Sequence, residues 1–479
     1  MLSGKRVLIL LDNAANREQV EPLLPPSGCA VIVTSRNKFA LPGLKEKDLD
    51  VLPLEEAKRL LLEISERIGG RAEELARICG CLPIALRNAA YALAERRDLS
   101  LAEYLERLQK ARNRVELVEA SFSLSYELLG PELQKLWCLL SIFPADFDRA
   151  GTGAVWELDL DPAAKSLSDL VKWSLVEYDP NNERYSLHDL ARDFAASRLQ
   201  HEEDVAAQQR HAEHYKNVLF ASNGLYSQGG ENVLAGLELF DREWANIQTG
   251  RAWAERNLQS GSVAGSLCNS YPEAGAYVLD LRLHPQEKIR WLETAVAAAR
   301  KIKDKGAEGV HLGNLASAYY LLGESRQAIE YYEQALTIAR EFGDRRGEGD
   351  ILGNLGLAYH NLGETRRAIE YYEQAQAIAR EISDRRGEGY AMGNLGLAYY
   401  NLGETRRAIE YYEQALAIAR EIGDRRGEGN YMFNMSLVLA SFGKHKQAIE
   451  YAKAALKIRE EIEDPRAEKV RRQLEKWQG

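Results

Sequence analysis

The chain has 479 residues, of which 45% are apolar, as in an ordinary folded protein with about three or four domains. It has no uncharged apolar run of about 18 residues, no basic leader pattern and only five scattered cysteines, so we expect a cytoplasmic protein without membrane spans or disulfides. The net charge of −10 argues against nucleic acid as a partner, and no Cys/His spacing predicts a metal site.

Two apolar runs near the N-terminus each end in a side chain suited to a nucleotide site. Residues 6–11 (RVLILL) predict a buried parallel strand that ends at Asp12, and residues 29–33 (CAVIV) predict a second strand, closely followed by Arg36. A carboxylate in this position holds Mg²⁺ in P-loop enzymes, and an arginine at a strand end can reach a terminal phosphate. Each signal is weak alone, because many buried strands end in aspartate without any catalytic role.

The order of four short motifs is more informative than any one of them. Helical patterns follow the two strands over residues 55–67, 70–79, 83–96 and 101–110. The motifs are LILLDNA, VIVTSR, GCLPIAL at residues 80–86 and SLHD at residues 186–189. In this order they resemble the NB-ARC ATPase of STAND-class signalling proteins, which occurs in plant resistance proteins, the apoptosome scaffold and bacterial regulators.

The resemblance implies a role for each matching residue. Asp12 matches the Walker B acid, Arg36 the sensor arginine, Pro83 the proline that packs on adenine, and His188 the histidine that touches the β-phosphate of ADP. For His188 alone, a histidine satisfied within a winged-helix core is the alternative. The resemblance also implies a partial α/β nucleotide-binding subdomain at 1–50, a helical bundle at 51–118 and a winged helix at 119–200 that locks the closed state.

The phosphate-binding loop of that family, GxxxxGK followed by Ser or Thr, occurs nowhere in the 479 residues. Its backbone N–H groups and its lysine supply most of the grip on phosphate. We therefore expect no catalytic residues, no ATP hydrolysis and at best weak ADP binding, with ADP or ATP and Mg²⁺ as cofactors only in a longer chain. Two strands alone leave open edges and an uncovered apolar face, so we expect a fragment, a truncated product or a partner that completes the sheet.

Residues 201–283 predict a helical linker with irregular repeat-like helices. Residues 202–220 and 237–257 have amphipathic helical patterns. The pairs Asn223-Gly224 and Gly229-Gly230 are expected to separate helices, because both are turn signals. A further helix near residues 276–283 is expected to open the regular array.

From residue 311 onward a segment recurs with a period of 40 residues. Residues 351–389 and 391–429 are near copies, and 311–349 and 431–469 are more divergent ones. Each copy predicts two helices joined at a glycine turn, with small residues and tyrosines at the packing positions. This spacing resembles tetratricopeptide repeats in a long form, which implies a right-handed α-solenoid at 284–464, closed by a capping helix at 465–479.

Two polar columns of the repeat are candidate contacts for a partner. Asn314, Asn354, Asn394 and Asn434 recur on the inner helices, where an amide can both donate to and accept from a peptide backbone. Arg346, Arg386 and Arg426 recur near the starts of these helices and could meet acidic side chains. The alternatives are structural: the asparagines cap turns of neighbouring repeats, and the arginines pair with Asp344, Asp384 and Asp424.

The leading hypothesis is a mainly α-helical signal-transduction scaffold whose repeats bind a protein or peptide and are coupled to a degenerate NB-ARC switch. The rivals are an ADP/ATP-binding STAND ATPase or a transcription regulator as part of a longer chain, and a purely structural interaction module. In residues 187–199, Asp189 and Asp193 offset Arg192 and Arg198, which argues against a DNA-reading helix. The identity of the partner and the oligomeric state stay open.

Overall fold

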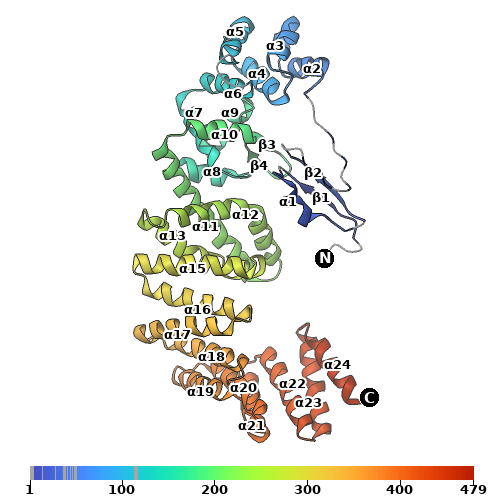
Figure 1. Ribbon diagram of the computed structural model, residues 1–479, viewed down its shortest axis with the longest axis vertical. Helices are drawn as coiled ribbons and strands as arrows, with labels where there is room; N and C mark the ends of the chain where they lie inside the picture. The colour runs from blue at the N-terminus through green and yellow to red at the C-terminus, as the bar shows by residue number, and fades with distance from the viewer. Residues whose placement is uncertain are drawn as a thin grey trace. The chain divides into compact units, whose positions relative to one another are not determined.

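The computed structural model describes residues 5–12, 14–26, 28–35, 39, 41, 43, 45, 47, 51–112 and 117–478 (Figure 1). The chain divides into two compact units, Met1–Leu124 and Ser125–Gly479. The described residues are mainly helical, as the sequence predicts.

The first unit begins with a small parallel sheet. Strands β1 (Leu8–Leu11) and β2 (Ala30–Val33) pair in parallel, and helices α1 (Arg17–Val20) and η1 (Glu21–Leu23) lie between them in the chain. On one face, Leu11 and Val33 pack against a cluster around Val20. On the other face, Leu8, Leu10 and Ile32 are 63%, 63% and 51% exposed. The prediction of buried strands is therefore wrong for one face, because no described residue covers it.

The rest of this unit is helical. Its elements are α2 (Leu54–Ile64), η2 (Glu66–Arg71), α3 (Ala72–Ile78), α4 (Pro83–Glu95) and α5 (Leu101–Arg112), and α6 (Leu117–Leu128) leads into the second unit. The helix predicted at 55–67 ends earlier, at Ile64, and the chain turns through η2, where Gly69 has a φ of 54°. The Arg67 guanidinium fixes this turn by donating to the carbonyl oxygens of Leu93 and Leu99, both at 2.7 Å.

The second unit opens with helices and one antiparallel hairpin. Its first elements are α7 (Pro131–Leu139), η3 (Leu140–Ile142), α8 (Arg149–Trp156), α9 (Leu160–Lys172), β3 (Glu177–Asp179), β4 (Arg184–Ser186) and α10 (Asp189–Arg198). Trp137, Phe143 and Phe147 are fully buried among them. Helices followed by a hairpin are the elements that a winged helix requires.

Four helices link this part to the repeats: α11 (His201–Gln228), α12 (Asn232–Arg256), α13 (Ser262–Ala274) and α14 (Ala276–Arg282). The break predicted at Asn223-Gly224 is wrong, because α11 runs through it. The Asn223 side chain instead accepts hydrogen bonds from the backbone N–H groups of Tyr277, at 2.9 Å, and Val278, at 3.2 Å, and so caps α14. Gly229 and Gly230 do separate α11 from α12, and both have positive φ.

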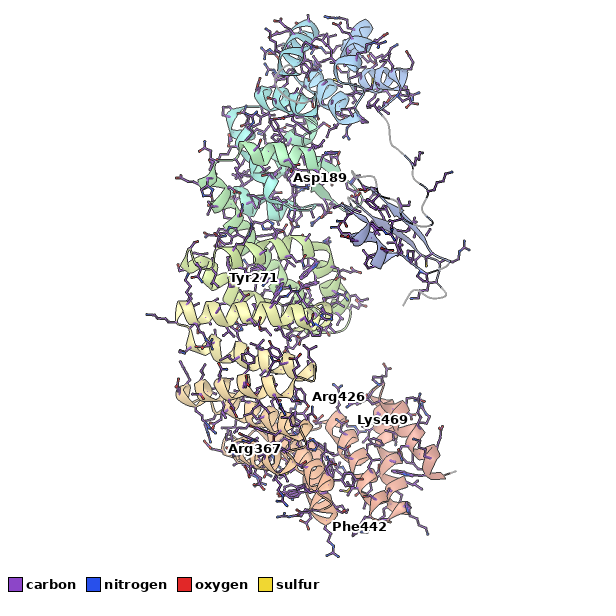
Figure 2. All side chains as sticks on the ribbon, in the orientation of Figure 1. Asp189, Tyr271, Arg367, Arg426, Phe442 and Lys469 are labelled. Atoms are coloured by element: carbon purple, nitrogen blue, oxygen red, sulfur yellow. The ribbon has the colours of Figure 1, made fainter. Side chains whose placement is uncertain are left out.

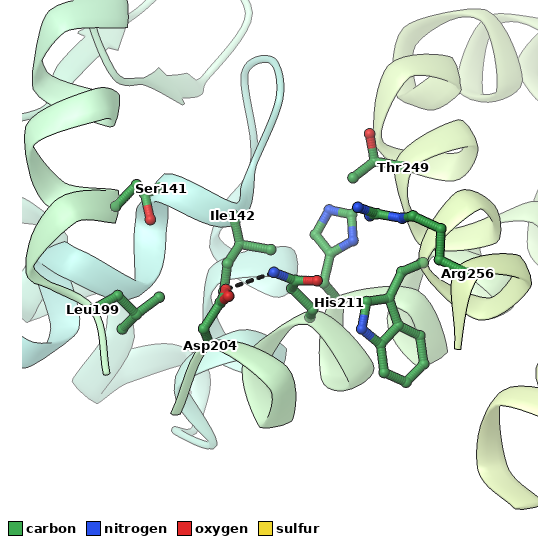
Figure 3. A pocket seen from close by; sticks show the side chains of 10 residues that line it. Ser141, Ile142, Leu199, Asp204, His211, Thr249 and Arg256 are labelled. Carbon is green, nitrogen blue, oxygen red and sulfur yellow. Dashed lines mark hydrogen bonds between the residues drawn. The ribbon is translucent and has the colours of Figure 1, made fainter. Parts of the chain in front are cut away.

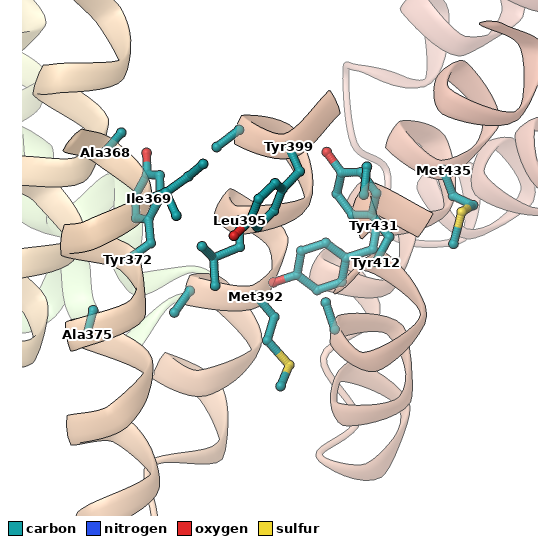
Figure 4. Packing of buried hydrophobic residues seen from close by; sticks show 14 of the residues in the cluster. Ala368, Ile369, Tyr372, Ala375, Met392, Leu395, Tyr399, Tyr412, Tyr431 and Met435 are labelled. Carbon is teal, nitrogen blue, oxygen red and sulfur yellow. The ribbon is translucent and has the colours of Figure 1, made fainter. Parts of the chain in front are cut away.

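The repeats form stacked helix pairs. They comprise α15 (Pro285–Ile302), α16 (Lys305–Leu321), α17 (Ser325–Phe342), α18 (Arg345–Asn361), α19 (Thr365–Glu381), α20 (Arg385–Asn401), α21 (Thr405–Glu421), α22 (Arg425–Ser441), α23 (His445–Glu461) and α24 (Ala467–Gln478). Gly363 ends the turn after α18 with a φ of 80°, as predicted. Tyr372, Leu395, Tyr399 and Tyr412 interleave in one continuous core (Figure 4).

A buried glutamate ties each pair of helices to its neighbours. Glu388, only 5% exposed, accepts from Arg380 at 2.7 Å and also pairs with Arg385. Arg385 in turn donates to Glu421 of α21, the second helix of its own pair, at 3.1 Å. The same arrangement recurs at Glu348 and Glu428, so identical sequence is stabilised by identical contacts.

Candidate partner-binding groove

Two neighbouring cavities lie along the inner helices of the array. The first, of about 490 Å³, is lined mainly by α18, α19 and α20, and the second, of about 360 Å³, by α20, α22, α23 and α24. Both are lined by Tyr390 and Asn394, so they are consecutive parts of one groove, here called the inner groove. Figure 2 places Lys469, which lines the second cavity, on the last helix.

The asparagine column faces this groove over three repeats. Asn354 and Asn394 line the first cavity, and Asn394 and Asn434 line the second. Asn314 is exposed on α16 and lines neither. Helical spacing explains the placement, because Leu352, Leu355 and Tyr359 turn into the core and leave Asn354 on the opposite side.

Most amides of this column form no hydrogen bond with the described residues. Within the described parts of the chain, no hydrogen bond engages the side chains of Asn314, Asn354 or Asn394, so the turn-capping alternative does not occur there. Asn434 differs, because its amide lies near the buried hydroxyl of Tyr412. A half-buried amide without a partner can serve both hydrogen-bonding groups of a peptide unit.

The arginine column is exposed at the starts of the same helices. Arg346 lines the first cavity, whereas Arg386 and Arg426 line neither cavity. Among the described residues none of the three forms an ion pair. Their proposed partners are occupied otherwise, because Asp344, Asp384 and Asp424 cap the helices by accepting from the N–H groups of Gly347, Gly387 and Gly427.

Sequence reasoning missed a second column that lines the groove. Asp350, Tyr390 and Asn430 occupy the same position in successive repeats, and each lines a cavity. Tyr390 is 52% exposed. Burial raises the pKa of the Asp350 carboxyl, and the charge of Asp384 raises it further. The available signal was variation: this position differs in every copy, although residues 351–389 and 391–429 are nearly identical.

The tyrosines of the paired helices are accounted for by packing. The rings of Tyr359 and Tyr371 stack with centroids 5.2 Å apart, and those of Tyr399 and Tyr411 stack at 5.3 Å. The Arg367 guanidinium lies 4.4 Å from the Tyr359 ring centroid. These contacts lie away from the two cavities and add no group to the inner groove.

The residues predicted for a nucleotide site are divided between the units. In the first unit, exposed Asp12 accepts from the Thr34 hydroxyl, and exposed Pro83 is the first residue of α4. Arg36 lies outside the described residues. In the second unit, His188 is exposed and caps α10 through its Nδ1, which accepts from the Leu190 N–H at 3.2 Å. The alternative of a core histidine is therefore wrong for His188.

The two arginines of helix α10 contact other residues of the same unit. Arg192 donates to the carbonyl oxygen of Phe143 at 2.9 Å and pairs with Asp189 at 2.7 Å. The Arg198 guanidinium lies 4.9 Å from the Phe194 ring centroid. Both cations therefore make contacts within the fold, and Arg198 is exposed as well.

A third cavity, of about 270 Å³, lies where η3, α10, α11 and α12 meet (Figure 3). Asp204, His211, Thr249 and Arg256 contribute to its lining, and the Gln208 amide donates to Asp204 at 2.6 Å. No sequence motif marks this place.

Two classes of site find no support in the described parts of the chain. There, no three His, Cys, Asp or Glu side chains gather in a way that could hold a metal ion. Likewise, none of the helices described is both long and apolar enough to cross a bilayer.

Comparisons with known proteins agree with this geometry. The tetratricopeptide repeat model matches residues 286–341, 312–381, 347–421 and 387–461. The regulatory protein AfsR of Streptomyces griseus is 38% identical over 217 residues, which are 42% of this chain and 22% of that protein. AfsR of Streptomyces coelicolor is 35% identical over 263 residues, which are 50% of this chain and 26% of that protein. The chain thus spans about a quarter of these relatives.

Among solved structures, a STAND protein with a tetratricopeptide repeat sensor from Pyrococcus horikoshii covers 97% of this chain and 76% of its own, with 20% identity and a TM-score of 0.41. BtubC of P. vanneervenii covers 47% of this chain and 92% of its own, with 22% identity and a TM-score of 0.41. These overlaps are too loose to argue from, and the assignment depends on the matched repeats, the motif order and the AfsR relatives. The repeats of residues 286–461 are therefore tetratricopeptide repeats, and the chain as a whole is similar to STAND-class NB-ARC/tetratricopeptide-repeat regulators.

Proposed function

We propose that the repeat array binds an extended segment of a protein partner in the inner groove, as the input of a regulatory signalling protein. One observation carries the proposal: the unpaired amides of Asn354 and Asn394 recur in register on successive repeats and face the same groove. An amide pair of this kind can hold a backbone whatever its side chains are. Stacked repeats commonly use such a concave surface for binding.

The remaining lining of the groove suits an extended segment. Leu357 and Leu397 supply an apolar floor beside the amides, and Asp350 and Tyr390 vary between otherwise similar repeats. Backbone hydrogen bonds would therefore supply affinity, and the variable positions would select side chains. This division favours one partner sequence over a general affinity for unfolded chains.

Buried contacts connect the repeats to the hairpin-containing part of the same unit. Arg184 of β4, 4% exposed, pairs with Glu243 of α12 and donates to Asp146 at 3.0 Å. The Asn246 amide donates to the Asp146 carbonyl oxygen at 3.0 Å. Helix α12 packs on α11 and α13, and α13 packs on α15, the first helix of the array. Occupation of the groove can therefore act on the hairpin through packed helices.

The regulatory part of the proposal rests on the relatives. Both Streptomyces proteins are named as regulatory, and the motif order resembles a nucleotide-controlled switch. Without a phosphate loop in these residues, we propose that the switch is degenerate and that partner binding is the activity that this chain retains.

The test uses the full 479-residue chain. A phage library of random 12-residue peptides is selected against it, and a selected peptide is then synthesised and titrated by calorimetry. The double variant Asn354→Ala/Asn394→Ala is expected to bind roughly tenfold more weakly or worse, because about 1 kcal/mol is lost with each amide hydrogen bond. Its circular dichroism and melting midpoint are expected to match the wild type.

The matched control is Gln374→Ala/Gln414→Ala, which removes two amides at the same 40-residue spacing from exposed positions of the outer helices α19 and α21. This control is expected to bind like the wild type. Equal affinity in the asparagine variant, or failure of any peptide to be selected, would contradict the proposal.

A further inference from the structure

The cavity shown in Figure 3, here called the junction cavity, lies between the hairpin-containing part of the second unit and the linker helices. Helix α11 lines it with positions 204, 208 and 211, and helix α12 with positions 249, 253 and 256. Each set is spaced i, i+4, i+7, which places it on one face of its helix. Packed helices normally bury apolar residues at such positions. Here all of them but Trp253 are polar or charged, so the two faces enclose a polar space.

The lining of the junction cavity includes one acidic and one basic side chain, Asp204 and Arg256. Among the described residues neither of them forms an ion pair. Asp204 Oδ1 accepts from the Gln208 amide at 2.6 Å, and Arg256 Nε donates to the Ala252 carbonyl oxygen of its own helix at 3.3 Å. In Figure 3 the side chain of His211 lies between the two charged side chains. A molecule that carries both charges can bridge them.

The rest of the lining supplies neutral polar groups and apolar surface. Burial lowers the pKa of His211 to about 3, so its imidazole is neutral at neutral pH and adds no second cation. The Thr249 hydroxyl forms no hydrogen bond within the described parts of the chain. Ile142, Leu199 and the buried Trp253 add apolar surface. These groups suit a small molecule with a charged end and an apolar end.

The volume of the junction cavity limits the size of its ligand. About 270 Å³ is just below the range of about 300–1,000 Å³ that is typical of pockets for drug-sized molecules. Ala196 and Arg256 of the lining are exposed, so the cavity is open to solvent beside them. A small metabolite can therefore enter and fill it.

We propose that the junction cavity binds a free α-amino acid with an apolar side chain. Arg256 and Thr249 donate to its carboxylate, and Asp204 accepts from its ammonium group. Leu199 and Trp253 pack on its side chain. This inference does not depend on the inner groove, which lies on other helices of the chain.

A ligand in the junction cavity acts on the contact between the linker helices and the hairpin. His211 Nε2 lies 3.5 Å from Asn246 Oδ1, and the Asn246 amide donates to the Asp146 carbonyl oxygen. Asp146 also accepts from Arg184 of the hairpin. Because the ligand binds the assembled junction, it stabilises this arrangement by mass action. The amino acid is thus a second input to the protein, separate from the partner segment.

The experiment uses the full chain and the standard free α-amino acids, each at about 10 mM, which saturates a site of millimolar affinity. Amino acids that raise the melting midpoint are then titrated by calorimetry. We expect leucine, isoleucine, methionine or phenylalanine to bind at a single site. Binding by none of the amino acids, or only by those with charged side chains, would overturn the inference and leave the proposed function standing.

Derivatives of the bound amino acid test each of its charges separately. Its primary amide lacks the carboxylate, and its N-acetyl form lacks the ammonium group. Each derivative is expected to bind about tenfold more weakly or worse, because a charge-assisted hydrogen bond is lost. Equal affinity of either derivative would contradict recognition of both charges and overturn the inference.

Conservative variants locate the site and separate recognition from folding. Arg256→Gln is expected to bind the amino acid about tenfold more weakly and to lose its preference for the amino acid over the amide. Asp204→Asn is expected to lose the preference over the N-acetyl form in the same way. A variant that merely disturbs the fold would weaken all three ligands alike, and that result in both variants would overturn the inference.

The matched controls remove exposed charges that do not line the cavity. They are Glu202→Gln on α11 and Arg290→Gln on α15, and both are expected to keep the wild-type affinity for the amino acid. Wild-type affinity in Asp204→Asn and Arg256→Gln as well would place the binding site elsewhere and overturn the inference.

Discussion

Polar side chains fall into two groups, according to whether other described residues use all of their hydrogen-bonding groups. Glu388 is buried and forms ion pairs with both Arg380 and Arg385, so it stabilises the structure. Asn354 and Asn394 keep hydrogen-bonding capacity that no described residue uses. The asparagine column was predictable, because a polar residue recurs at a fixed repeat position.

His211 provides a pH-dependent test at this scale. It is 1% exposed, and burial lowers its pKa to about 3. The unfolded chain therefore takes up the proton first as the pH falls below about 6.5, and stability is lost from there toward pH 3. Between pH 6.5 and 5.5, urea unfolding of His211→Gln is expected to show about 1 kcal/mol less loss of unfolding free energy than the wild type.

The control for this titration is exposed His445→Gln, whose pH slope is expected to match the wild type. His211→Gln also loses a ring contact with Tyr215, so its stability at pH 7 falls independently and the slope alone is the readout. If the pH slope of His211→Gln matched the wild type, the pKa of His211 would have to be the same in the folded and unfolded chains.

At the scale of elements, the distance between paired helices is set by small residues. Gly356 faces the Tyr372 ring so closely that an added Cβ would lie 2.4 Å from its Cε1. Gly353 lies in the same helix, one turn earlier, and an added Cβ there would meet nothing within 4 Å. The two glycines therefore separate a packing requirement from the general cost of glycine in a helix.

We expect Gly356→Ala to lower the free energy of unfolding by about 1–3 kcal/mol, because overpacking outweighs the gain in helix propensity. Gly353→Ala is expected to raise it by up to about 1 kcal/mol. Urea titrations measure the free energy of unfolding of both variants. A shift of the same sign in both would mean that Tyr372 moves aside at little cost.

The boundaries of the elements were predictable where the cause is local. The turn at Gly363 was predictable because glycine tolerates the positive φ found there, and the repeat period predicts the helices from α16 to α23. The prediction at Asn223-Gly224 was wrong because a tertiary contact outweighs a local turn signal: Asn223 caps α14, 54 residues further along the chain. The exposed face of β1 and β2 was predictable, because a sheet of two strands leaves one apolar face uncovered.

At the scale of the whole molecule, the sequence predicted the order of the nucleotide-binding motifs along the chain. It did not predict whether their residues form a nucleotide site. Asp12, Pro83 and His188 are all exposed, and each already has a local structural role or contact. The motif order predicts ancestry, since it reflects a shared arrangement of strands and helices. It does not predict binding strength, because most of the phosphate grip comes from a loop that these residues lack.

A nucleotide titration of the whole chain tests the prediction that ADP binds weakly and that ATP is not hydrolysed. We expect calorimetry with ADP and Mg²⁺ to show no affinity tighter than micromolar, and a phosphate-release assay to show no ATP turnover. His188→Ala is expected to behave like the wild type in both. Tight ADP binding that disappears in His188→Ala would restore a working switch to this chain.

The ion pairs that cross from one repeat to the next have an evolutionary consequence. Arg340 with Glu348, Arg380 with Glu388, and Arg420 with Glu428 make the same junction three times. Copies joined by such interchangeable junctions can be gained or lost whole by unequal recombination, with no change in how their neighbours meet. Each gain would lengthen the inner groove by one more asparagine of the column and one more residue of the column that contains Asp350, Tyr390 and Asn430.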